Sequence, residues 1–269
     1  MAHKKFQDLN LSDAYLFAAA LQDAEVCRKT LELLLGRDVE SVTVHAEHSL
    51  LYSSECRSIR LDVYSRDETG YHYNLEMQGE NEGNLPRRSR YHQAQMDVTS
   101  LRPGEDFNEL RPNYIIFICC FDPFGEGLYR YTFTNKCSET GQELGDGTTK
   151  IFLNTKGRNP VNVPDSLIHF LAYLENSTAE CADERDDAVR QIHSRVTEVK
   201  RDRTWESRYM RFEELLQKER RKGKNEGREE TQARMQELIR RMLADGAQEE
   251  LAGLAEKDFL EAMYQRYGL

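Results

Sequence analysis

An uninterrupted apolar run, YIIFICCF, occupies residues 114–121. A strand that buries only one face alternates apolar and polar residues, whereas a continuous apolar run is typical of a central strand buried on both faces. Such a strand requires a layer of structure on each side of its sheet. The run therefore predicts an α/β fold, and 269 residues are enough for one large domain of this kind plus an appendage.

The segments around this run show helix and strand patterns. Residues 11–35 are expected to form one helix, with Ser12 as N-cap and Gly36 as its end. Pro86 near the first turn predicts a second helix that reaches about Leu101. Alternating residues predict strands in VTVHAEHSLL, SIRLDVY and YHYNLEMQ, short strands are expected in LYRYTF and TKIFLN, and residues 165–222 read as helical.

Composition restricts the classes of function. A net charge of −10 argues against nonspecific coating of DNA, although it is compatible with a DNA enzyme whose clustered carboxylates hold cations. No segment has the roughly 18 consecutive apolar residues of a membrane helix, and the N-terminus lacks the apolar region of a secretion signal. Six cysteines without metal-ligand spacing are read as reduced thiols. We expect a cytoplasmic protein without membrane contacts.

The chain changes character after residue 199. Trp205, Tyr209, Phe212 and Leu216 form a helical stripe, but residues 217–232 contain no large apolar side chain. This stretch is expected to be a solvated helix or tether, acting as a spacer or as an oligomerisation stalk. Two amphipathic segments follow, which could pack on each other or on a partner, including a second copy of the chain. The predicted division is 1–199 for the main domain and 200–269 for a charged helical extension.

The strongest chemical signal is the segment SIRLDVYSRDETGYHYNLEMQ, residues 58–78. A hairpin with the three-residue loop 68–70 would need Gly70 in the left-handed conformation. That register places Asp62 opposite Glu76, with Gln78 on the same face and an apolar opposite face made by Leu61, Val63, Leu75 and Met77. A loop of two or four residues would instead separate Asp62 and Glu76 onto opposite faces.

Two carboxylates facing each other across a strand pair repel unless a cation lies between them. Mg²⁺ takes oxygen ligands, commonly one or two carboxylates with water and substrate phosphate completing its shell. The spacing is thus compatible with a Mg²⁺ site, and also with a solvated hairpin that carries two surface acids.

Several segments together resemble the PD-(D/E)XK nuclease family transposases, also called recombination-promoting nucleases. They are LDVYSRDETGYHYNLEMQ, LPRRSRYHQAQMD, YIIFICCFDPFGEGLYRYTFTNKC, GTTKIFLNTKG and the late charged helix. The resemblance covers about residues 8–230. It implies an αβββαβ restriction-endonuclease-like core with a mixed sheet flanked by helices, Mg²⁺-dependent DNA cleavage with Mn²⁺ as a substitute, and a link to recombination or transposition.

The resemblance also implies roles for individual residues. Asp62 and Glu76 match the two metal-binding acids, and Gln78 stands where the wider superfamily has Lys. Asp13 matches a weaker acidic metal position, but it is equally explained as an acid favoured at a helix N-terminus. Gln can hydrogen-bond the attacking water but cannot activate it by charge, so the metal would have to supply most of the activation.

The helix after the second acid carries Arg87, Arg88 and Arg90, which are expected to contact DNA phosphates or, for Arg88 and Arg90, Glu76. Its stripe of Tyr91, Ala94, Val98 and Leu101 is expected to pack inward. The leading hypothesis is a metal-dependent DNA endonuclease. The alternative is a weakly active or inactive DNA-binding or interaction protein that keeps the nuclease fold.

Overall fold

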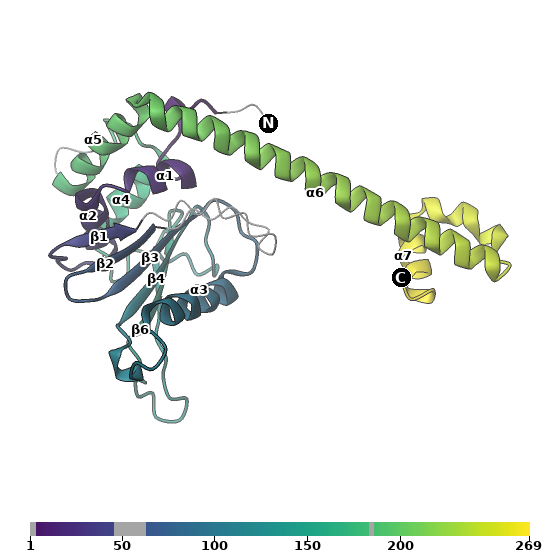
Figure 1. Ribbon diagram of the computed structural model, residues 1–269, viewed down its shortest axis with the longest axis horizontal. Helices are drawn as coiled ribbons and strands as arrows, with labels where there is room; N and C mark the ends of the chain where they lie inside the picture. The colour runs from purple at the N-terminus through teal and green to yellow at the C-terminus, as the bar shows by residue number, and fades with distance from the viewer. Residues whose placement is uncertain (1–3, 46–62, 183–185) are drawn as a thin grey trace. The chain divides into compact units, whose positions relative to one another are not determined.

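The computed structural model describes residues 4–45, 63–182 and 186–269. Its centre is a six-stranded sheet with the order β1-β2-β3-β4-β6-β5 (Figure 1). The strands are β1 (Val42–His45), β2 (Val63–Asp67), β3 (His72–Gln78), β4 (Asn113–Cys119), β5 (Arg130–Phe133) and β6 (Thr148–Asn154). Strands β3, β4 and β6 are mutually parallel, whereas β1, β2 and β5 join antiparallel, so the sheet is mixed.

Strand β4 lies between two parallel neighbours, as its apolar sequence predicts. Ile115, Ile116, Phe117 and Ile118 have no exposed surface. The expectation of a strand buried on both faces is confirmed. Because parallel strands end at the same edge of a sheet, the chain reversals after β3, β4 and β6 meet at one edge, where Gln78, Cys119 and Asn154 align.

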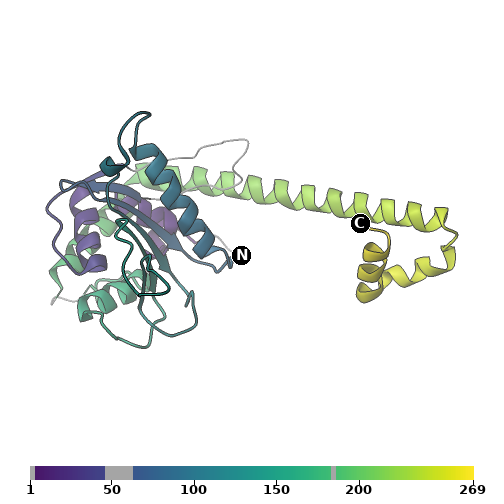
Figure 2. The same cartoon turned by 90° about the horizontal axis from the view of Figure 1, so that it is seen from below.

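Helices cover both faces of the sheet, which confirms the predicted α/β class. Figures 1 and 2 show α3 (Leu85–Ser100) on one face and, on the other, α1 (Ala14–Ala20), α2 (Ala24–Leu35), α4 (Asp165–Glu175) and α5 (Asp187–Arg201). Under α3 lies an apolar cluster made by Leu85, Met96, Ile115, Phe117, Cys119, Tyr131 and Phe152. Short 3₁₀ helices occupy Phe6–Asp8 (η1) and Phe107–Glu109 (η2).

The hairpin between β2 and β3 has the predicted register in its described part. Val63 faces Leu75, and Arg66 faces His72. The Asp67 amide donates to the Tyr71 carbonyl at 3.1 Å, and Gly70 has φ +89°, so the loop is the three-residue loop 68–70. Val63, Leu75 and Met77 are buried on the face opposite Glu76.

The first helical segment differs from its prediction. The structure has two helices where one was expected over residues 11–35, and Asp13 rather than Ser12 caps the first. Asp23 accepts the amides of Glu25 and Val26, and this second cap starts a new helix at Ala24. Gly36 ends α2 at φ +68°, as predicted.

The C-terminal region is helical, as expected. Helix α6 runs over Arg203–Ala244 and is followed by η3 (Gln248–Ala255) and α7 (Lys257–Arg266). The described side chains of residues 217–234 are exposed, as expected for a solvated charged helix. The amphipathic segments pack on the end of α6 through a cluster centred on Leu238, Met242, Met263 and Tyr264.

Contacts divide the chain into two compact units, Met1–Tyr209 and Met210–Leu269. This division falls later than the one predicted after residue 199. The first turns of α6 belong to the N-terminal unit because Tyr209 packs against Phe6 and Tyr15, with ring centroids 5.4 and 5.3 Å away. Trp205 joins them through an edge contact with Tyr15.

Candidate metal and DNA site

Glu76 lies near the end of β3 with its side chain on the face covered by α3. Its lateral neighbours on that face are Phe117 of β4 and, beyond it, Phe152 of β6, both part of the apolar cluster under the helix. Only 5 % of Glu76 is exposed. A carboxylate with so little water around it needs a counter-charge and hydrogen bonds to remain ionised.

Arg88 supplies that counter-charge. One guanidinium nitrogen, Nη2, pairs with Oε1 of Glu76, and the other, Nη1, donates to Oε1 of Gln78 at 3.0 Å. The guanidinium carbon stands 5.8 Å from the centre of the Phe117 ring. The expectation that Arg88 can face Glu76 is confirmed.

His92 approaches the same carboxylate from the next turn of α3. Its Nε2 lies 3.4 Å from Oε2 of Glu76, and its ring packs edge-on against Phe117 with centroids 6.0 Å apart. The side chain is buried. Among the described residues, Oε2 of Glu76 accepts no hydrogen bond although it is buried.

Gln78 is held in place by its neighbours on this face. Its Nε2 donates to Oε1 of Glu76 at 2.8 Å, while its own oxygen accepts from Arg88. Burial raises the pKa of the adjacent Cys119 thiol to about 12 even with the positive charge of Arg88 opposing that rise, so the thiol is neutral at physiological pH in the metal-free protein. Glu76, Gln78, Arg88 and His92 thus form a connected polar group under α3.

The inward face of α3 differs from the predicted one. Tyr91 and Val98 are 57 % and 78 % exposed, and Ala94 is exposed as well, so the predicted inward stripe is wrong. The buried positions are Leu85, Ser89, His92 and Met96. His92 was missed in the sequence because Tyr91 was taken as the residue that marks the buried face of the helix. Leu85 and Met96 lie eleven positions, or about three turns, apart, and they would have marked the correct face.

The three arginines of α3 divide between two environments. Arg87 and Arg90 are exposed, whereas the Arg88 side chain is 28 % exposed and turns to Glu76. Arg87 and Arg90 therefore lie on the surface, whereas Arg88 pairs with Glu76 within the site.

A comparison with protein families decides the family of this chain. The family model described as PD-(D/E)XK nuclease family transposase matches residues 14–225. The chain belongs to this family. A search of curated proteins found no significant match, and a search of solved structures found none either.

As a member of a PD-(D/E)XK nuclease family, the chain is expected to use a divalent metal, and its acids can be compared with that need. Glu76 fits, because a buried carboxylate oxygen without a hydrogen bond is what an oxygen-seeking cation can use. Asp62 lies outside the described residues. Within the described parts of the chain, no three His, Cys, Asp or Glu side chains are grouped closely enough to hold an ion.

Asp13, the third predicted ligand, has a structural explanation. Its Oδ1 accepts the backbone amides of Tyr15 and Leu16 at 3.0 and 3.2 Å, which makes it the N-cap of α1. The contacts agree with the alternative explanation of Asp13, an acid favoured at the N-terminus of a helix. Its part in metal binding stays a proposal.

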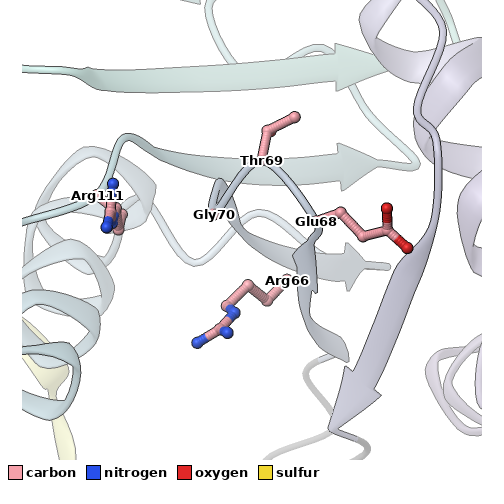
Figure 3. A pocket seen from close by; sticks show the side chains of 5 residues that line it. All are labelled: Arg66, Glu68, Thr69, Gly70 and Arg111. Atoms are coloured by element: carbon pink, nitrogen blue, oxygen red, sulfur yellow. The ribbon is translucent and has the colours of Figure 1, made fainter.

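A separate pocket of 320 Å³ lies at the hairpin tip, lined by Arg66, Glu68, Thr69, Gly70 and Arg111 (Figure 3). The Glu68 carboxylate points away from both arginines and accepts a hydrogen bond from Ser41. The tip is the opposite end of β3 from Gln78, so this pocket contains none of the predicted site residues.

No helix in the described part of the chain is long and apolar enough to span a membrane.

Proposed function

We propose that this family member is a Mg²⁺-dependent DNA endonuclease acting in recombination or transposition, with Mn²⁺ as a substitute metal. The observation that carries the proposal is the buried Glu76 carboxylate, with one oxygen paired to Arg88 and the other without a hydrogen bond. An acid kept in this environment is costly for stability, and such cost is characteristic of functional sites. Membership of a nuclease family supports the reaction class.

In this proposal Glu76 and Asp62 hold the metal, with Asp13 as a weaker third candidate. The register supports Asp62 as the partner of Glu76, because pairing of Val63 with Leu75 would continue to that pair. When bound, the metal lowers the pKa of a coordinated water and offsets charge on the scissile phosphate.

The side chains around the carboxylate have distinct tasks. Gln78 hydrogen-bonds and orients the attacking water, with its amide held by Glu76 and Arg88. His92 is a positioning residue, since its ring lies beside Oε2 of Glu76 and packs edge-on against Phe117. Arg87 and Arg90 bind backbone phosphates of the DNA.

The test of the proposed function is a plasmid-nicking assay with the full chain. Cleavage is expected with Mg²⁺ or Mn²⁺ and none in EDTA. DNA binding without cleavage under any metal would instead support an inactive protein that retains the fold.

The exposed arginines should give DNA affinity a measurable salt dependence. The double variant Arg87→Gln/Arg90→Gln should reduce the slope of log K against log[salt] by up to about 2, if each arginine neutralises one phosphate. The control, Arg66→Gln/Arg111→Gln, removes the same charge at the hairpin tip and should leave the slope unchanged. Equal losses in both variants would mean that the α3 arginines are not specific phosphate contacts.

The proposal places the protein in the cytoplasm, in keeping with its free thiols at Cys27, Cys119, Cys120, Cys137 and Cys181. DNA is its proposed partner. Self-association through the C-terminal helices stays a prediction, and the apolar residues of those helices are used largely within their own cluster.

A further inference from the structure

We propose that Arg88 couples DNA binding to metal binding by occupying Glu76 until a phosphate takes its guanidinium. This inference rests on the proposed function and adds a regulatory step to the same site. It predicts that the DNA-free protein binds metal weakly, and that DNA strengthens metal binding by removing an internal competitor.

In the absence of metal, Arg88 balances the negative charge of Glu76. The Glu76 side chain is 7 % exposed, and Arg88 pairs with its Oε1. The same guanidinium reaches Gln78, so Arg88 joins the proposed metal ligand to the proposed water-orienting residue. An arginine fork suits this double contact, whereas a lysine ammonium can only act as a point charge.

The Arg88 guanidinium and a metal ion cannot both occupy the Glu76 carboxylate without repulsion. A divalent cation on the Glu76 carboxylate would stand within a few ångströms of the guanidinium, and repulsion between cations is strong where water is scarce. Metal and Arg88 therefore compete for one carboxylate. The apparent metal affinity is reduced by the fraction of molecules in which Arg88 holds the site.

Binding of DNA can release the Arg88 guanidinium from Glu76. The Arg88 side chain is 28 % exposed, and in the sequence of α3 it directly follows Arg87 and precedes Arg90 by two positions, both of which are exposed. A DNA phosphate held by Arg87 and Arg90 is also a ligand that the Arg88 guanidinium can bind through two hydrogen bonds. Moving to the phosphate keeps Arg88 paired and leaves Glu76 to the metal. Linkage requires that metal strengthens DNA binding by the same factor.

The experiment measures Mn²⁺ binding to the full chain by electron paramagnetic resonance, with and without a short duplex whose phosphorothioate linkages slow hydrolysis. For Arg88→Gln without DNA, we expect Mn²⁺ affinity to rise about tenfold, within the usual range of coupling factors. The gain that DNA gives to Mn²⁺ affinity should shrink by a similar factor. Arg111→Gln removes the same charge from an exposed side chain at the hairpin tip, away from the proposed DNA contacts, and should change neither quantity by more than about twofold.

Mn²⁺ affinity in Arg88→Gln that equals or falls below that of Arg111→Gln would overturn the coupling. If Arg88→Gln does not fold, Arg88→Lys keeps the charge without the double contact and should still bind Mn²⁺ more tightly than wild type; no gain in that variant overturns the coupling too. If wild type binds no Mn²⁺ with or without DNA, the proposed function fails together with the inference. If wild type binds Mn²⁺ and cleaves DNA, and the Arg88 variants bind Mn²⁺ with wild-type affinity, the coupling is overturned but the proposed function is not.

Discussion

Glu76→Gln should reduce DNA cleavage by at least about a thousandfold, because a metal at such a site contributes several kcal/mol of transition-state stabilisation. Gln keeps the size of the side chain and a hydrogen-bond acceptor for Arg88, but it lacks the charge that holds a divalent cation. In EDTA, where no metal contributes to DNA binding, the affinity for DNA should change little, since the exposed arginines remain. The measurements are the rate of plasmid nicking under saturating Mg²⁺ and the affinity for a short duplex.

Glu80→Gln is the matched control. Glu80 is an exposed acid just beyond the end of β3, and its loss should leave the nicking rate unchanged. A thermal melt of both variants separates chemistry from folding. A folded Glu76→Gln protein that nicks DNA at the wild-type rate would show that Glu76 is a structural partner of Arg88 and not a metal ligand.

Removing residues 201–269 should leave the N-terminal unit largely unfolded, whereas removing only residues 217–269 should leave it folded. The reason is the aromatic cluster of Phe6, Tyr15, Trp205 and Tyr209, in which the Tyr15 hydroxyl also donates to the Trp205 carbonyl at 3.3 Å. Burial within this cluster raises the pKa of Tyr15 to about 12. Loss of each large aromatic side chain costs about 3–5 kcal/mol, against a total stability of about 5–15 kcal/mol for a typical domain.

Urea unfolding followed by circular dichroism tests this expectation. In the full chain, Trp205→Ala should lower the free energy of unfolding by about 3–5 kcal/mol. Met210→Ala provides the control, because Met210 follows the cluster directly but is 59 % exposed, and its cost should stay below about 0.5 kcal/mol. Equal stability of the two truncated proteins would instead support the domain boundary predicted from composition, after residue 199.

Local rules in the sequence determined several elements correctly. A continuous apolar run can be satisfied only between two covered faces, and β4 has that position. The hairpin register followed from one glycine: Gly70 allows the left-handed turn, and the period-two alternation then fixes which residues share a face. These features depend on neighbouring residues alone, so they can be predicted without knowledge of the rest of the fold.

Tertiary structure decided the environment of the candidate site. The hairpin sequence was equally compatible with a solvated acid, but α3 returns over that face and buries Glu76. Burial then makes Arg88 the counter-ion and brings His92 to the carboxylate, whereas the apolar Tyr91 is left exposed. The phase of α3 could not be read from its apolar residues because two of its four buried positions are the polar Ser89 and His92. The sequence by itself therefore determined the strand that carries Glu76, and long-range packing decided what surrounds it, because burial and charge pairing depend on residues that only the folded chain brings together.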